Sequence, residues 1–471
     1  MLFNSYQFWV FLAIVLVLYR SLPHLWQNRL LLAASYIFYG FWDWRFLSLI
    51  FLSTLVDYWT AISIGQTNDP KRRRNYLLVS LIVNLGGLGI FKYYGFFSRE
   101  FAALLGSAGF SASLPALDII LPVGISFYTF QTLSYTIDVY RREIEPEKSF
   151  RDFALYVSFF PQLVAGPIER SSRLLPQLVQ PRQRRPDDFR EGLQHILIGL
   201  FKKVVIADNM AAIVNHVFSN GTANLSGAEC LVALYAFAFQ IYGDFSGYSS
   251  IAVGVSKWLG VDLMVNFDTP YFSASIREFW RRWHISLSTW LRDYLYVPLG
   301  GSRRGKWLTY RNLMITMLLG GLWHGAAWTF IVWGGLQGVL MSAERLGIEH
   351  GILRERASSR LGQCFRVFVT FHLVCLSWLV FRAESMTQFW SMLSAILTNF
   401  QITPFAMGAF GMLVFYTAPL LVYEAWLQKW QDPLEIRPFG WLRPALGYTY
   451  CAVMMLYFAP LDTHEFIYFQ F

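Results

Sequence analysis

A single histidine interrupts a long apolar stretch of this sequence. His324 lies in GGLWHGAAW at residues 320–328, and from residue 313 to residue 341 few other side chains can form strong hydrogen bonds. An imidazole is costly to bury at membrane depth, and polar groups there usually mark a reaction or transport path. Buried and neutral, it could remove the proton of a hydroxyl that attacks an acyl carbon, for about 10²–10⁴-fold in rate. The motif therefore predicts a general base; the alternative is a structural histidine that pairs with a nearby carbonyl.

A second histidine lies in a segment rich in tryptophan and arginine. Within residues 279–300, FWRRWHISLSTWLRDYLYVPLG, large apolar side chains recur at i, i+3, i+7, i+11 and i+14: Trp280, Trp283, Leu287, Leu291 and Tyr294. This spacing puts them on one face of a helix, which is typical of a helix that lies in the membrane interface. His284 would lie at the border of that face. The alternative is a membrane anchor with no chemical role.

Two aspartates also lie within or beside apolar stretches. Residues 242–248, YGDFSGY, place Asp244 between two glycines, where it could equally be a helix cap or a turn residue. Asp57, within LVDYW, is expected to pair with a neighbouring helix. The chain has no G-x-S-x-G elbow, no phosphate-binding glycine loop and no H-E-x-x-H, and its four cysteines are scattered. We therefore expect neither a metal nor a permanently bound cofactor.

The composition identifies the class of protein. Of 471 residues, 55% are hydrophobic and only 15% are charged, against about 25% in soluble domains, which indicates an integral membrane protein. We expect an all-α polytopic protein with about eleven spans in one membrane domain, residues 1–471. The net charge of +9 is spread over short loops, where cytoplasmic bias and anionic lipids explain it without a nucleic acid partner.

Basic clusters set the expected topology. Lysine and arginine gather at residues 20–29, 71–74 and 141–142, and an even number of apolar runs separates successive clusters. All three are expected in the cytoplasm, with the N-terminus on the outer, periplasmic side. The run Phe153–Ala165 stands alone between two basic stretches, so we expect it to be re-entrant or to lie on the membrane surface.

The stretch around His324 has an unusual length. About 29 apolar residues at 1.5 Å each make roughly 44 Å of helix, too long for one span and short for two. Gly320-Gly321 and Gly334-Gly335 offer places to break it. We expect a hairpin of two short helices with His324 deep in the membrane on a broken helix; the alternative is one steeply tilted helix.

Several long motifs resemble those of the membrane-bound O-acyltransferase (MBOAT) family, in its bacterial branch for exopolysaccharide O-acetylation. The resemblance runs nearly end to end, and both histidine motifs match without departure. The matching segments are PVGISFYTFQTLSY (122–135), FFPQLVAGPIER (159–170), YGDFSGYS (242–249), FWRRWHISLSTWLRDYLYVPLGG (279–301), GGLWHGAAW (320–328) and FIYFQF (466–471).

The resemblance implies a fold, a reaction and partners. It implies about eleven transmembrane helices with re-entrant and interfacial helices around an outward funnel and a cytoplasmic tunnel. His324 matches the family's essential histidine and His284 its second polar site. The acyl donor is expected to be cytoplasmic acetyl-CoA. The acetyl group is expected to cross the bacterial inner membrane to a periplasmic SGNH-like acetyltransferase within an exopolysaccharide synthesis complex, for an alginate- or cellulose-like glycan.

The remaining site residues follow from this expectation. Tyr242, Asp244, Ser246, Trp283 and Trp323 are expected to bind substrate around the two histidines. Arg282 and Arg292 are expected to help hold the CoA end, although basic interfacial helices usually contact lipid headgroups.

Two other functions stay open from the sequence. One is D-alanyl transfer to teichoic acid from a carrier-protein thioester, as in another branch of the family. The other is a proton-coupled transporter with His324 as a proton relay. No internal repeat is visible, and transporters commonly show one.

Overall fold

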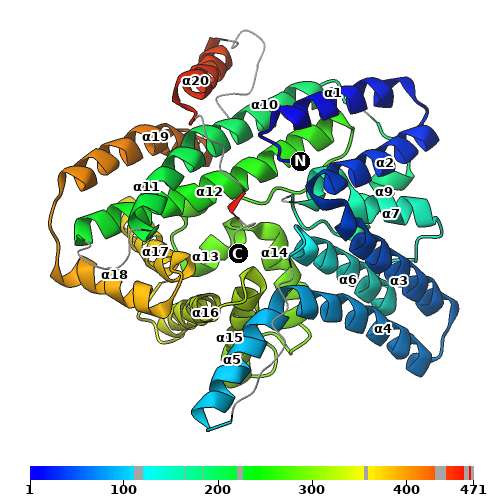
Figure 1. Ribbon diagram of the computed structural model, residues 1–471, viewed down its shortest axis with the longest axis horizontal. Coiled ribbons are helices and arrows are strands. Elements are labelled where there is room, and N and C mark those ends of the chain that lie inside the picture. The colour runs from blue at the N-terminus through cyan, green and yellow to red at the C-terminus, as the bar shows by residue number, and fades with distance from the viewer. Residues whose placement is uncertain are drawn as a thin grey trace. The chain divides into compact units, whose positions relative to one another are not determined.

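The computed structural model describes residues 1–110, 120–164, 166–183, 185–219, 226–354, 359–429, 442–460 and 466–467. Within these residues the regular elements are all helices, which confirms the predicted all-α class (Figure 1). Contacts divide the chain into two compact units: unit 1 is residues 1–192 and 252–264, and unit 2 is residues 193–251 and 265–471. The single membrane domain expected from the sequence stays a prediction.

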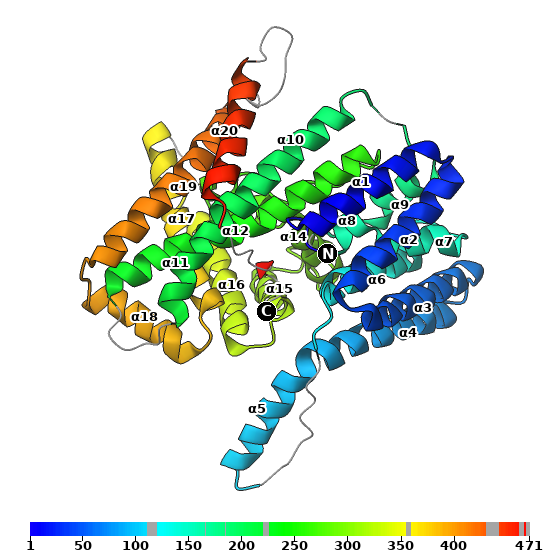
Figure 2. The ribbon, with the colours of Figure 1, turned by 45° about the horizontal axis from the view of Figure 1, so that its top comes forward.

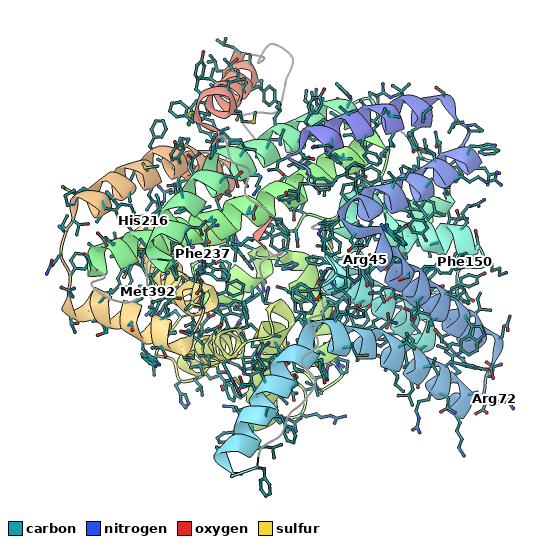
Figure 3. All side chains as sticks on the ribbon, in the orientation of Figure 1. Arg45, Arg72, Phe150, His216, Phe237 and Met392 are labelled. Carbon is teal, nitrogen blue, oxygen red and sulfur yellow. The ribbon has the colours of Figure 1, made fainter. Side chains whose placement is uncertain are left out.

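Unit 1 is built from helices that follow one another along the chain. They are α1 (Tyr6–Ser21), α2 (His24–Asp43), η1 (Trp44–Phe46), α3 (Leu47–Gln66), α4 (Pro70–Leu88), η2 (Gly89–Tyr93), α5 (Tyr94–Ser107), α6 (Ile125–Arg141), α7 (Phe150–Ser158), α8 (Phe160–Leu163) and α9 (Ser171–Val179). Asp69 caps α4 by accepting from the backbone N–H of Lys71, and Pro70 starts that helix. The basic cluster at residues 71–74 thus lies in its first turn, where Arg72 points outward (Figure 3).

A buried carboxylate joins three helices of unit 1. Asp57 of α3 is fully buried, and it accepts hydrogen bonds from Ser80 and Asn84 of α4 and from Thr136 of α6. A buried charge is tolerated where several donors satisfy its oxygens. The prediction that Asp57 pairs with neighbouring helices is confirmed.

The lone apolar run after residue 150 forms two short helices. α7 has 9 residues and α8 has 4, so neither can cross about 30 Å of hydrocarbon. Nearly every side chain of both is buried within unit 1. This arrangement agrees with the predicted non-spanning segment, whose last residue, Ala165, lies outside the described residues.

Unit 2 carries longer helices. They are α10 (Asp188–Leu200, which starts in unit 1), η3 (Phe201–Ala207), α11 (Asp208–Ser219), α12 (Gly227–Trp258, which ends in unit 1), η4 (Pro270–Phe272), α13 (Ile276–Arg282), α14 (Ile285–Leu291), η5 (Arg292–Tyr296), α15 (Lys306–His324), α16 (Trp328–Glu349), α17 (Arg360–Arg382), α18 (Met386–Thr398), α19 (Pro404–Lys429) and α20 (Leu442–Phe458). α10, η3 and α11 follow one another without a break and form one continuous helical segment beside α12 (Figure 1).

Four helical stretches of the described chain are long and apolar enough to cross a membrane. They are residues His24–Gln66, Pro70–Ser107, Arg360–Arg382 and Pro404–Lys429. Their outward faces carry large exposed apolar side chains, as lipid contact requires. The chain is therefore a multi-pass membrane protein, whereas the expected number of about eleven spans, the funnel and the tunnel stay predictions.

The stretch around His324 is a hairpin of two helices, as predicted. α15 ends at His324 and α16 starts at Trp328, and the two helices lie side by side (Figure 2). The predicted break points were wrong, because Gly321 and Gly334 both lie inside helices. A Cβ on Gly321 would come within 2.2 Å of the Phe330 carbonyl oxygen and 3.1 Å of the Gly334 Cα atom. These glycines are where the helices touch, a common use of small residues in membrane helix packing.

The segment predicted as one interfacial helix is three short pieces. α13 ends at Arg282, α14 starts at Ile285 and a π-helical turn begins at Arg292. The single-helix prediction was wrong because the backbone of His284 is left-handed, with φ of 44°. Trp283 and Leu287 are also buried in the core of unit 2, not on its surface.

Candidate active site

His324 occupies the end of a helix inside an aromatic enclosure. It is 4% exposed, and its ring centroid lies 5.1 Å from those of Trp323 and Trp333 and 5.4 Å from that of Phe381. The next residue must be glycine, since a Cβ on Gly325 would come within 2.1 Å of the Phe330 ring. The chain can therefore turn directly after His324, and the imidazole stays in a low-polarity environment.

His284 is held by a polar network of its own. It is fully buried, and its Nδ1 atom lies 3.2 Å from the side-chain oxygen of Asn266. The same oxygen accepts from the backbone N–H of Ser286 at 3.1 Å and from its hydroxyl at 2.9 Å. Phe245 packs edge-on against the imidazole with ring centroids 4.6 Å apart.

The charge state of His284 follows from this burial. His284 lies between two helices of seven residues each, neither of which can span a membrane. Removal from water lowers the pKa of the His284 imidazole from 6.5 to about 3, because burial penalises the charged form. The ring is therefore neutral near pH 7 and can accept a proton or a hydrogen bond.

The indole of Trp323 contacts both imidazoles. Its ring centroid lies 6.0 Å from that of His284 and 5.1 Å from that of His324. Unit 2 thus brings together two histidines that are 40 positions apart in the sequence. An aromatic ring beside an imidazole can also stabilise a transient imidazolium through its quadrupole.

Trp283 and Tyr242 pack against each other near His284. The Trp283 indole is buried and stacks on Phe279 at 5.4 Å, and its centroid lies 6.0 Å from that of Tyr242. The Tyr242 hydroxyl donates to Glu424 of α19, and the ammonium of Lys202 lies 3.3 Å from the same carboxylate. The Phe267 ring packs against Tyr242, Trp283 and His284, so both residues lie near His284. The Tyr242 hydroxyl is also a partner of the buried Lys202–Glu424 ion pair.

Asp244 lies in the middle of α12, so it is neither a helix cap nor a turn residue. It forms an ion pair with Lys203 at 2.9 Å, and Lys203 also contacts Asp208 at 2.7 Å. Its second oxygen accepts from the backbone N–H of Ile467 at 2.6 Å. Of the terminal motif FIYFQF, only Phe466 and Ile467 lie within the described residues, and both are buried. The Asp244 carboxylate therefore holds Ile467 against α12.

The three remaining predicted site residues lie in different surroundings. Ser246 is buried on α12, two residues after Asp244. Arg282 pairs with Glu278 at 2.8 Å and donates to the Thr269 hydroxyl. The Arg292 side chain is 61% exposed and pairs with the adjacent Asp293 at 2.7 Å.

Sequence reasoning missed the residues that support the site. Asn266, Lys202, Lys203 and Glu424 are all buried beside predicted site residues. A weak signal existed for the lysines and for Glu424, because charged side chains within apolar stretches need partners. Asn266 carries no such signal, since asparagine is common in loops.

Comparison with known proteins gives a consistent result. A model of the membrane-bound O-acyltransferase family matches residues 141–350, which contain both histidines. Probable alginate O-acetylase AlgI of Azotobacter vinelandii is 40% identical over 442 residues, 89% of this chain and 87% of that protein. Peptidoglycan O-acetyltransferase of Helicobacter pylori is 37% identical over 391 residues, 77% of this chain and 72% of that protein. Teichoic acid D-alanyltransferase of Streptococcus thermophilus is 29% identical over 284 residues, 55% of this chain and 68% of that protein.

Proposed function

This chain belongs to the membrane-bound O-acyltransferase family, and we propose that it supplies acetyl groups for the O-acetylation of an exopolysaccharide. It is an O-acyltransferase and a multi-pass membrane protein. The proposed acyl donor is cytoplasmic acetyl-CoA. The similarity to proteins named for acetylation of alginate and of peptidoglycan supports acetyl as the group and a polysaccharide as its destination.

The main support for the proposal is that two buried imidazoles contact the same indole ring, that of Trp323. His284 and His324 both contact Trp323, and each is less than 5% exposed. Acyl transfer to a hydroxyl needs a base in a place that water does not reach, since water would compete as the acyl acceptor. Two buried histidines among aromatic rings meet that requirement.

The proposed reaction is a direct transfer. The acceptor oxygen attacks the thioester carbonyl carbon while its proton passes to His324. The carbon–sulfur bond then breaks, and the imidazolium returns the proton to the CoA thiolate. Atoms and electrons balance without a covalent enzyme intermediate, and the step uses His324 as base and then as acid.

The other residues take supporting roles in this proposal. Neutral His284 orients the donor or assists the proton transfer, and Trp323 stabilises the imidazolium that forms. Tyr242, Asp244, Ser246 and Trp283 are proposed to bind substrate around the two histidines. A role for Arg282 and Arg292 with the CoA phosphates would require each to exchange its present carboxylate for a phosphate.

The proposal also sets a cellular context. We place the chain in the bacterial inner membrane with a periplasmic N-terminus, because its basic loops then face the cytoplasm. Basic loops on that side would also attract the phosphates of CoA. A periplasmic SGNH-like acetyltransferase in an exopolysaccharide synthesis complex would receive the acetyl group.

A second donor has specific support. The similarity to a teichoic acid D-alanyltransferase favours D-alanyl transfer from a carrier-protein thioester as the alternative. The lower identity and coverage of that match make acetyl-CoA the first choice.

The test is transfer from acetyl-CoA by the purified full-length chain in nanodiscs. Carbon-14 in the acetyl group would be followed to an added acceptor for wild type, His324→Ala and His350→Ala. His350 follows the far end of α16 and is exposed, so it is a matched control on the same hairpin. We expect turnover in wild type and His350→Ala and its loss in His324→Ala. Full activity of a folded His324→Ala variant would refute the role of His324, and activity only with an aminoacyl carrier protein would favour the second donor.

A further inference from the structure

Asn266 holds the turn that carries His284 through both its backbone and its side chain. It is 2% exposed and lies between α12 and η4. Its backbone carbonyl accepts from the N–H of Ile285 at 3.0 Å, and its side-chain oxygen accepts from the N–H of Ser286. Its amide nitrogen donates to the Ser249 hydroxyl at 3.3 Å. A left-handed histidine persists only where its surroundings hold it, and these bonds do so.

The same contacts determine which ring nitrogen of His284 carries the proton. The Ser286 N–H can only donate, so the Asn266 atom that faces it must be the amide oxygen. An amide oxygen can only accept, so the His284 Nδ1 atom beside it must donate. In the neutral ring the lone pair is then on Nε2.

We propose that Asn266 is a positioning residue, which fixes His284 as the Nδ1–H tautomer and so leaves Nε2 as its basic atom in the acyl-transfer site. This inference rests on the proposed function for its consequence, but not for the tautomer itself. It turns the general role of His284 into a specific one: Nε2 accepts a hydrogen bond or proton from the reacting groups.

The Asn266 amide is uncharged, and this affects the protonation of the His284 ring. A carboxylate at the same place would favour the charged imidazolium, whereas an amide leaves the ring neutral. The charged groups on neighbouring elements are mostly compensated: Asp244 by Lys203, Glu424 by Lys202 and Arg282 by Glu278. The other titratable groups on the elements around His284 include Tyr242 and Tyr248 on α12, Asp268 and Tyr271 after Asn266, Arg277 and Arg281 on α13, and His324 on α15.

The tautomer can be measured without any activity. The full-length chain would be labelled with nitrogen-15 at histidine, placed in lipid and studied by solid-state NMR, with the His284 signals assigned by their loss in His284→Gln. We expect a protonated Nδ1 and an unprotonated Nε2 in wild type at neutral pH. A protonated Nε2 in wild type would overturn the proposal, whatever the enzyme does.

The consequence can be measured from the pH profile of kcat. Asn266→Asp keeps the size and the acceptor oxygen but adds a charge, so the acid limb should move up by about one to three pH units. Asn312→Asp is the matched control, because Asn312 is equally buried in unit 2 and donates to the Gly301 carbonyl instead of contacting a histidine. An unmoved limb in Asn266→Asp, or an equal shift in Asn312→Asp, would contradict the proposal.

The two readouts separate the possible failures. A wild-type chain that shows the expected tautomer but transfers no acyl group would refute the proposed function alone. A chain that transfers acetyl groups but shows a protonated Nε2 would refute only the role of Asn266.

Discussion

Asp57 in unit 1 and the histidine pair in unit 2 are buried to the same degree but have different neighbours. Asp57 and His284 are fully buried, and His324 is 4% exposed. Asp57 receives hydrogen bonds from side chains on two other helices. The His284 imidazole lies beside the Asn266 side-chain oxygen, and the His324 imidazole packs against Trp323, Trp333 and Phe381.

This difference shows that burial of a polar group does not by itself indicate chemistry. The oxygens of a carboxylate that is surrounded by hydrogen-bond donors are already occupied, so such a residue mainly joins helices. An imidazole among aromatic rings keeps its capacity to accept a proton. The nature of the partners therefore separates a structural polar residue from a candidate base, and the following experiments test that distinction.

The largest expected effect is on the histidine pair. His324→Ala should lower kcat by about 10²–10⁴-fold with the fold intact, because the base is lost. If both histidines serve the same step, the double variant with His284→Gln should be barely slower than the worse single variant. Initial rates in nanodiscs would measure this. Effects that multiply would show that the two histidines act independently.

The corresponding change at Asp57 should affect stability instead. Asp57→Ala leaves Ser80, Asn84 and Thr136 without their shared acceptor, which should cost about 3 kcal/mol of stability. Turnover per folded molecule should stay near the wild-type value. Thermal unfolding and initial rates would be compared with Glu100→Ala, an exposed carboxylate of the same unit. A folded Asp57→Ala variant without turnover would remove the distinction between the two regions.

The helix contact that positions His324 should respond to a single methyl group. Gly321→Ala would push the Phe330 carbonyl and Gly334 away, at a cost of about 2 kcal/mol. Gly335→Ala is the matched control, since its Cβ would meet only the Leu318 side chain at 3.4 Å. The melting temperature should fall clearly more for Gly321→Ala. Equal melting temperatures would mean that the helices can separate without cost.

The smallest expected effect near neutral pH is the pH dependence of stability. The folded His284 has a pKa of about 3 and the unfolded residue about 6.5, so between these values only the unfolded chain binds this proton. Stability from this group is complete above about pH 6.5 and falls as the pH falls toward 3, by about 1.4 kcal/mol per pH unit. Between about pH 7 and about pH 5, the melting temperature of His284→Gln should therefore fall less than that of wild type. The same loss in both proteins would show that His284 is not buried in its neutral form.

Local sequence determined the class of protein, the all-helical fold, the pairing of Asp57 and the hairpin that ends at His324. These features depend on composition, on the length of apolar runs and on the cost of polar groups in lipid, which are all readable along the chain. The glycine positions were misread because a glycine in a membrane helix can break it or let another helix approach, and both uses leave the same sequence.

Only the tertiary structure decided how the site is assembled. The pattern in residues 279–300 has the period of one helix, yet Asn266, 18 positions before His284, holds that residue in a left-handed turn. The contact of His284 and His324 through Trp323, and the Tyr242–Glu424 bond across 182 positions, likewise join distant segments. Such contacts depend on how helices pack, and a single sequence carries no local signal of which distant side chains will meet.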